Sequence, residues 1–329
     1  MSIEIIQTEQ NETSKKRNDF SKIYDKYGLF LILALLVVAF SLINPNFISL
    51  YNIQNIFKQS SINGLIAFGM TFVILLGAID LSVGSILPLV GFFIGSLLVT
   101  YGFPIYIVLP LGIFLGIFLG TINGLLISKY KLQPFIATLV TMAVYRGITL
   151  VASEGLPVRN IANSSEFMGW MNHGQIGPIP VFMLILVITL VALYVLLHKT
   201  VFGRHVYATG GNEEAARLST VPTQKIKIYC YALCGLLTSI AAILHLSRYN
   251  SMYPNVGIGM ELDAIAAVVI GGTSMTGGRG RIVGTFIGVL IIGVLNNGLN
   301  LIGVSSFYQE IVKGVVILIA VIIDQKKNK

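Results

Sequence analysis

The residues of this chain that could do chemistry are polar side chains placed inside long apolar runs. Asp80 and Ser82 lie in the run Gly77-Ala-Ile-Asp-Leu-Ser-Val-Gly84, and Asp263 opens a second such run. Four amide side chains have similar surroundings, those of Asn123, Asn296, Asn297 and Asn300. Polar groups at membrane depth are costly and are therefore candidates for function. Because amides donate and accept hydrogen bonds without net charge, they suit a neutral polyhydroxylated solute better than an ion.

Each of these residues also has a structural interpretation. The asparagines can hydrogen-bond one helix to another, and the sequence does not decide between this and contact with a solute. We expect the Asp80 carboxylate to cap the first amides of the following helix rather than to contact a ligand. For Asp80, capping and ligand contact both require a break in the helix at this point, and interrupted helices are typical of segments that line a cavity. The glycines that mark the predicted helix breaks are Gly77, Gly84, Gly271 and Gly272.

Sequence motifs for catalysis are absent. No Gly-x-x-x-x-Gly-Lys-Ser/Thr stretch occurs, so the chain cannot hydrolyse ATP by itself. Neither His-Glu-x-x-His nor Gly-x-Ser-x-Gly occurs, and there is no Cys/His cluster. Cys230 and Cys234 lie one helical turn apart in an apolar stretch without further metal ligands, so we expect them to pack. We therefore expect a protein that is not an enzyme and that needs no cofactor or metal.

Composition identifies the surroundings of these residues. Of 329 residues, 55% are hydrophobic and 11% are charged, which excludes a water-soluble enzyme and favours an all-α polytopic protein in a lipid bilayer. The net charge of +8 is not carried by any basic run suited to nucleic acid, so no nucleic-acid partner is expected. The apolar runs predict ten transmembrane helices, at 28–43, 61–79, 82–100, 104–128, 134–152, 180–197, 226–246, 259–274, 282–299 and 307–323.

The distribution of Lys and Arg predicts the orientation of these spans. With an N-terminal tail (1–27) and a C-terminal tail (324–329) both in the cytoplasm, most of the 22 Lys and Arg residues fall on the inner side. The permease domain would then cover 28–323. Its outer loop, 153–179, contains the only tryptophan and is expected to fold at the surface.

The inner loop, 198–225, contains the signals of a short exposed helix. Asn212 is a good N-cap, and Glu213 and Glu214 occupy the first turn, where the helix dipole favours acidic residues. Residues Ala215, Ala216 and Arg217 continue the helix. We therefore expect a short helix parallel to the membrane on the cytoplasmic side.

An internal repeat is suggested by two glycine stripes. Gly112, Gly116 and Gly120 precede Asn123-Gly-Leu, and a similar stripe from Gly284 precedes Asn297-Gly-Leu with one residue inserted. Because the two spans are five apart, the copies would have opposite directions in the bilayer, as in inverted-repeat transporters. Spans 2–5 and 7–10 would form the repeat, although chance is the alternative, because such stripes recur in packed membrane helices.

Three further residues within predicted spans carry charge. Arg146, and Glu310 with Lys313 one turn away in the tenth span, are expected to neutralise each other or nearby partners. A proton relay is the alternative for these residues.

These motifs resemble a known family. From about Ser41 to Asp324 the chain resembles the permease subunits of bacterial sugar ATP-binding-cassette importers, and most closely those for ribose. The stretches that carry the resemblance are Asn44-Pro-Asn-Phe47, Gly69 to Ser85, Pro134 to Val140, Gly210 to Ser219, Glu261 to Ser274, Gly280 to Thr285 and Leu295 to Ser306.

The resemblance implies a function and partners. Two copies of the chain would form a path across the inner membrane, with a cytoplasmic two-cassette ATPase and a periplasmic sugar-binding protein. Glu214-Ala215-Ala216 would be the Glu-Ala-Ala element that docks into the ATPase. The family usually has glycine at the place of Thr220, so the sequence does not specify at which residue this helix ends.

Two other function classes remain at this point. An ion-coupled secondary sugar transporter also has inverted repeats, and it would transport without an ATPase. A membrane scaffold or receptor fits the surface loops but leaves the asparagines at membrane depth unexplained.

Overall fold

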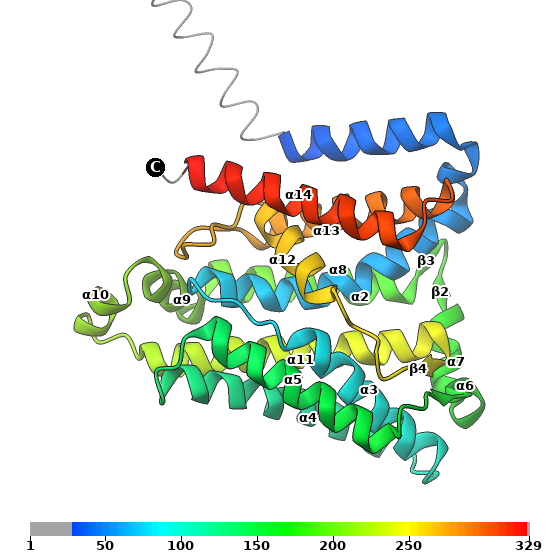
Figure 1. Cartoon of the computed structure of the whole chain (residues 1–329), viewed down its shortest axis with the longest axis horizontal. Coiled ribbons are helices and arrows are strands. Elements are labelled where there is room, and N and C mark those ends of the chain that lie inside the picture. The colour runs from blue at the N-terminus through cyan, green and yellow to red at the C-terminus, as the bar shows by residue number, and fades with distance from the viewer. Residues whose placement is uncertain (1–27, 328–329) are drawn as a thin grey trace, which may run out of the picture.

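The computed structural model describes residues 28–327, which form helices joined by short connections (Figure 1). The first helix covers Gly28–Ile43. The later helices, in chain order, are η1 (Pro45–Ile48), α2 (Leu50–Leu75), α3 (Val83–Val99), α4 (Ile105–Ser128), α5 (Pro134–Ser153), α6 (Ile161–Ser164), α7 (Glu166–His173), α8 (Val181–Lys199), α9 (Val201–Gly211), α10 (Glu213–Leu218), α11 (Thr223–Tyr249), α12 (Met260–Ile270), α13 (Ile282–Leu301) and α14 (Ser306–Lys327).

Strands are limited to two short antiparallel pairs within this part of the chain. The pair β1 (Val158–Arg159) and β4 (Ser251–Met252) joins the segment after α5 to the segment after α11. The pair β2 (Gln175–Ile176) and β3 (Ile179–Pro180) is a local hairpin before α8. These pairs fix loops and add no sheet to the core.

The helices have the character of an all-α membrane protein. Among the described residues, five helices are long and apolar enough to cross a membrane, namely α4, α5, α8, α11 and α13. Gly28–Ile43 and α3 are shorter apolar helices. Each of the ten predicted segments contains a helix, but the helix bounds differ from the predicted ones.

The largest boundary difference is at the start of α2. Helix α2 begins at Leu50, eleven residues before the predicted start at 61, because the Ser49 hydroxyl caps the amide of Asn52. Polar residues fill its first turns, and a hydropathy pattern does not detect them as helix. Helix α14 continues to Lys327, into the predicted C-terminal tail. The predicted N-terminal tail, 1–27, lies outside the described residues.

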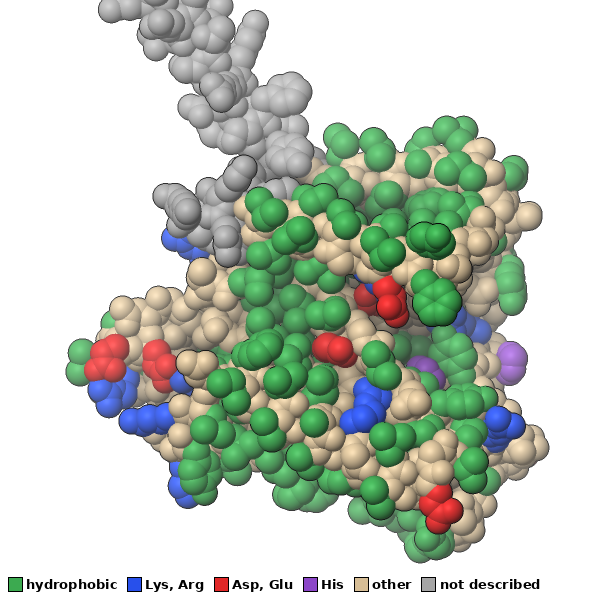
Figure 2. All heavy atoms as spheres, in the orientation of Figure 1, with side chains coloured by type: hydrophobic (Ala, Val, Ile, Leu, Met, Phe, Trp, Pro, Cys, Tyr) green, Lys and Arg blue, Asp and Glu red, His purple; other side chains and the backbone are tan. Residues whose placement is uncertain are grey.

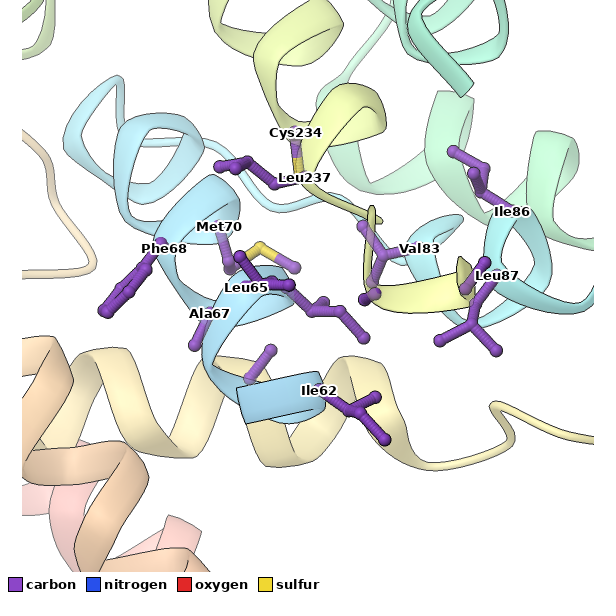
Figure 3. Close-up of a cluster of buried hydrophobic side chains, with 14 of the residues drawn as sticks. Ile62, Leu65, Ala67, Phe68, Met70, Val83, Ile86, Leu87, Cys234 and Leu237 are labelled. Carbon is purple, nitrogen blue, oxygen red and sulfur yellow. The ribbon is translucent and has the colours of Figure 1, made fainter. Parts of the chain in front are cut away.

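The core lies where α2, α3 and α11 meet (Figure 3). Leu65, Phe68 and Met70 of α2 are fully buried together with Val83 of α3 and Cys234 of α11. Helix α2 is buried on all sides over its second half because that half has no polar face. Both cysteines are free and buried, so the prediction that they pack is confirmed.

Two sets of four helices pack according to one scheme. The sets are α2–α5 and α11–α14, and their first helices, α2 and α11, pack against each other. Helix α11 also packs against α3 and α4 of the first set, and α2 packs against α12 and α13 of the second. Helix α3 contacts α4 and α5, just as α12 contacts α13 and α14. The helices α2–α5 and α11–α14 therefore have matching partners.

The two glycine stripes make close backbone contacts. Gly120 of α4 lies against the backbone of Tyr231 in α11, and Gly288 of α13 lies against the backbone of Ala267 in α12. No side chain fits between these backbones. Both stripes therefore allow two backbones to pack closely. The partner of α4 is α11, a helix of the other set, whereas the partner of α13 is α12, a helix of the same set.

The two longer loops lie at opposite ends of the molecule (Figure 1). Loop 153–179 folds into α6, α7 and short strands at one end, called here the α7 end. Loop 198–225 lies at the other, the α10 end, and it contains α9 in addition to the short helix that the sequence predicts. Helix α9 forms because Thr200 caps its first turn and Phe202 stacks on Phe72 of α2, at 6.2 Å between ring centroids.

Candidate functional site

A polar cavity of about 200 Å³ lies between α2, α11, α12, α13 and α14. The face of the molecule in Figure 2 is recessed, with acidic side chains and a histidine in the recess. Apolar contacts in the cavity come from Ile62, Ile258 and Met260. Its polar lining is Gln59, Asn63, His245, Arg248, Tyr249, Asp263, Asn296, Asn300, Gln309 and Lys313. The cavity is therefore a polar space surrounded by otherwise apolar helices.

Two contacts organise one wall of the cavity. Lys313 Nζ of α14 lies 3.0 Å from Asp263 Oδ2 of α12, and Gln309 Nε2 donates to Asn300 Oδ1 at 3.2 Å. The observed partner of Lys313 is therefore Asp263, a residue of another helix, and not Glu310. These contacts leave the wall electrically neutral where Asp263 meets Lys313.

Three polar atoms of the cavity residues are buried without a partner. They are Asn296 Oδ1, His245 Nδ1 and Arg248 Nη1, none of which has a hydrogen-bond partner within residues 28–327. The side chain of Asn296 is 4% exposed and that of His245 is 6% exposed. Buried polar groups are normally hydrogen-bonded, so these atoms point to a partner outside the chain.

A second polar cluster surrounds Asp80. The Asp80 Oδ1 atom accepts hydrogen bonds from the amide and hydroxyl of Ser82 at 2.9 and 2.6 Å, and Asn123 Nδ2 donates to the Ser82 hydroxyl at 2.7 Å. All three side chains are fully buried, and none lines the polar cavity. Asp80 thus bonds the residue directly before α3, but the predicted cap on the first amides of that helix is not formed.

Asn297 belongs to neither cluster. Its amide forms two reciprocal hydrogen bonds with that of Asn52 in α2, both at 2.9 Å. These bonds join α13 to α2. The contact favours the interhelical interpretation for Asn297, whereas Asn296 and Asn300 face the cavity.

The predicted break glycines lie at the ends of α3 and α12. Gly77 has φ +71° between α2 and α3, and Gly272 has φ +84° after α12, conformations that favour glycine. Gly271 caps the C-terminus of α12. Gly84 lies in the first turn of α3 and not in the break, where its backbone lies close to that of Gly257.

Arg146 of α5 connects the first turn of α3 to the segment that precedes α12. Its Nη1 atom donates to the carbonyl oxygens of Pro254 at 2.9 Å and Val256 at 2.7 Å, and its Nη2 atom donates to that of Gly84 at 2.7 Å. The guanidinium thus satisfies two backbone oxygens of the loop before α12 and that of Gly84, whose usual helical donor four residues on is Pro88 and has no N–H. These bonds give Arg146 a structural role.

Helix α10 has the predicted cap. Asn212 Oδ1 accepts from the Ala215 amide at 3.0 Å, so this prediction is confirmed. Glu213 pairs with Lys227 of α11 at 2.6 Å, and Glu214 with Arg217 at 2.6 Å. Figure 2 shows basic and acidic side chains gathered at this end of the molecule.

The end of α10 explains the position of Thr220. Thr220 has φ +66°. The Thr220 and Val221 amides donate to the carbonyl oxygens of Arg217 and Ala216, at 3.1 and 3.0 Å. This is a Schellman motif, whose left-handed residue is usually glycine. The helix therefore ends normally, with a β-branched residue in a conformation that glycine adopts more easily.

Three backbone segments meet at the C-terminus of α9, next to α10. Gly210 at the end of α9 contacts the Leu75 carbonyl and the Gly278 amide, and the Gly278 amide donates to the Leu75 oxygen at 2.9 Å. Gly277 contacts the backbones of Gly210 and Gly77. We call Gly77, Gly210, Gly277 and Gly278 the glycine junction. It joins α9 to both connections that contain helix breaks.

Comparison with known proteins identifies the family. The family described as "Branched-chain amino acid transport system / permease component" matches residues 52–321. The chain belongs to this permease family.

The permease is also similar over its full length to individual transport proteins. It is 53% identical to the ribose import permease protein of Bacillus subtilis (strain 168), over 98% of this chain and 100% of the relative. It is 46% identical to that of Escherichia coli (strain K12), over 96% and 99%. The D-allose transport system permease protein of Escherichia coli (strain K12) is 39% identical, over 98% of each chain. No solved structure matches the permease.

Sequence reasoning missed several cavity residues of the permease. Gln59, His245 and Gln309 are not among the predicted site residues, and Arg248 lies between the predicted spans 226–246 and 259–274. The available signal was spacing, because His245 and Arg248 lie one turn apart at the end of an apolar helix. Their approach to Asn296 depends on how α11 packs near α13, which the sequence does not specify.

Proposed function

We propose that this chain is the membrane subunit of an ATP-driven importer that moves ribose, or a similar simple sugar, inward across the bacterial inner membrane. The observation that carries the proposal is the full-length similarity to ribose import permeases, at 53% identity for the Bacillus subtilis protein. The polar cavity lined by amides agrees with a neutral, hydroxyl-rich cargo.

The architecture we propose is ten spans with both ends in the cytoplasm and an inverted repeat of α2–α5 and α11–α14. The matching partners of the two sets of helices support the repeat. The concentration of Lys and Arg on one side supports the orientation. In this arrangement α10 is cytoplasmic, and the α7 end, with loop 153–179, is periplasmic.

The partners we propose are a second copy of the chain, a two-cassette ATPase and a periplasmic sugar-binding protein. Helix α10 suits docking to the ATPase because Leu218 is 76% exposed at its end, while the Glu213–Lys227 pair fixes its start to α11. The hydrolysis of ATP takes place in the partner, since this chain has no phosphate-binding loop.

The coupling route we propose begins at α10 and passes through α9. Only Asn212 separates the two helices, so motion of α10 is transmitted to the glycine junction. There α9 contacts both the α2–α3 and the α12–α13 connections through backbone atoms. Close-packed contacts transmit displacement well. One movement at the ATPase would therefore shift both interrupted helices.

The solute pathway we propose passes beside Asn296 and Asn300, while Asp80, Ser82 and Asn123 hold the start of α3. Asn297 belongs to the packing of α13 on α2. Asn296 and Asn300 are assigned to the pathway because they line the cavity, whereas the other four residues do not.

The test is reconstitution in proteoliposomes with the cognate ATPase and binding protein. Uptake of labelled ribose should require both partners and ATP, and should exceed uptake of galactose and xylose. Transport by the chain alone under an imposed ion gradient would instead identify a secondary transporter. The double variant Glu214→Arg/Ala216→Asp should lose the ATPase on co-purification and abolish uptake. Intact uptake by this variant would contradict docking at α10.

A further inference from the structure

We infer that the polar cavity between α2, α11, α12, α13 and α14 is a binding subsite for one neutral monosaccharide ring, held by His245, Arg248 and Asn296. The inference rests on the proposed sugar transport and adds a site to it. The cavity lies toward the α7 end, where Lys58 of α2 donates to the Asn172 oxygen at 2.7 Å. On the proposed orientation this is the side on which the binding protein delivers its sugar.

The size of the cavity restricts its occupant. Its volume is about 200 Å³, below the roughly 300–1,000 Å³ that is typical of sites for drug-sized ligands. A single pentose or hexose ring agrees with this space, whereas a disaccharide does not. The cavity is also far larger than the ~30 Å³ share of one water molecule in the liquid.

The unpartnered atoms restrict the chemistry of the occupant. Asn296 Oδ1 is an acceptor, Arg248 Nη1 is a donor, and His245 Nδ1 is either, depending on its tautomer. Leaving such groups unpaired in a dry interior costs free energy. Each hydroxyl of a sugar both donates and accepts, so one ring can satisfy all three. An apolar occupant would satisfy none of them.

Rings and amides complete the site. The His245 and Tyr249 rings lie 4.5 Å apart between centroids, and the Arg248 guanidinium lies 5.2 Å from the centre of the Tyr249 ring. Flat side chains of this kind offer a surface to the C–H face of a sugar. Most of the remaining polar lining is uncharged amide, from Gln59, Asn63, Asn300 and Gln309.

The balance of charge favours a neutral sugar over a sugar phosphate. Lys313 is neutralised by Asp263 at 3.0 Å, which leaves Arg248 as the uncompensated charge among the lining residues. Phosphate recognition typically uses bidentate or clustered basic groups. A site for a sugar phosphate is therefore the competing outcome of the test.

The experiment measures binding of D-ribose to the purified full-length chain in lipid nanodiscs, by saturation-transfer NMR and calorimetry. His245→Phe and Asn296→Leu should each weaken binding at least tenfold. The matched control is His198→Phe, because His198 also contacts a tyrosine ring, Tyr194 at 4.8 Å, but lies outside the cavity lining. The control should bind ribose like the original chain, and thermal unfolding should show all three variants folded.

Three results would overturn the inference. They are absence of ribose binding to the folded chain, equal binding by the His245 and His198 variants, and tighter binding of ribose 5-phosphate that Arg248→Gln abolishes. Failure of the subsite is distinguishable from failure of the proposed function. If the reconstituted complex imports ribose while the binding results are negative, only the subsite is wrong. If the complex imports no sugar, the proposed function is wrong.

Discussion

The polar clusters at Asp80 and at Asp263 differ in what surrounds them. Asp80 bonds Ser82 and is fully enclosed by protein. Asp263 pairs with Lys313 from another helix, at the wall of a cavity. Both lie near the N-terminus of a short helix, α3 or α12, and these helices have matching packing partners.

The difference teaches that a carboxylate among apolar helices has no single meaning. At Asp80 the bonds are local and hold the backbone before α3. At Asp263 the bond crosses from α12 to α14. Both clusters leave buried polar atoms without a partner within residues 28–327, among them Asp80 Oδ2 and Asn296 Oδ1. Only those near Asp263 belong to residues that line open space, where a solute could bind. Substitutions in the two clusters should therefore separate stability from transport.

The largest expected effect comes from Asp80→Ala. This change removes the acceptor of the Ser82 amide and hydroxyl, and buried groups left unsatisfied in this way cost about 1–3 kcal/mol each. We expect loss of folded protein in thermal unfolding and in membrane yield. Asp263→Asn in the same assays should leave most of the protein folded. Equal loss for both would remove the distinction between the clusters.

Gly210→Ala should disturb the α2–α3 and α12–α13 connections at once. A methyl group here meets the Leu75 carbonyl and the Gly278 amide, and overpacking costs about 1–3 kcal/mol, or roughly tenfold in the population of a working conformation. Uptake by the reconstituted complex should fall accordingly while the ATPase still co-purifies.

Gly211→Ala provides the control for this prediction. No atom lies within 4 Å of a methyl group added at Gly211, so uptake should be unchanged. Equal uptake by the two variants would show that the glycine junction does not transmit motion.

Asp263→Asn should reduce transport more than stability. Lys313 then lacks its partner, although its side chain is 24% exposed and water screens part of the charge. We expect uptake to fall by roughly fivefold, which corresponds to about 1 kcal/mol. Adding Lys313→Met should restore part of the uptake by removing the unpaired charge. A double variant worse than the single one would contradict the pairing.

The smallest expected effect comes from Thr220→Gly. A non-glycine residue in the left-handed region costs about 1–2 kcal/mol. Glycine loses more conformational freedom on folding, at a cost of roughly 0.5–1 kcal/mol, so the net stabilisation of the C-terminus of α10 should be small. The measure is the unfolding temperature of the complex with the ATPase. Ser219→Gly is the control, because Ser219 has φ −84° and gains nothing from glycine. Stabilisation by Ser219→Gly instead would contradict the assigned end of α10.

Sequence reasoning predicted local features well and long-range ones poorly. The cap at Asn212 depends on residues three positions apart, so it was readable from the chain. The approach of His245 to Asn296 depends on how α11 and α13 each pack against α2, which no local pattern encodes. Helix α9 was missed because its stabilising contact, Phe202 on Phe72, joins distant parts of the chain.

The glycine junction also limits how the permease can change partners. The backbones at Gly210 and Gly278 touch with no side chain between them, so substitution is not tolerated there. Adaptation to a different ATPase therefore cannot occur through changes at these two residues. On the proposed docking, it must take place on the exposed surface of α10, at residues such as Glu214, Arg217 and Leu218. We therefore expect exchange of α10 alone, between related transporters, to transfer compatibility with the ATPase.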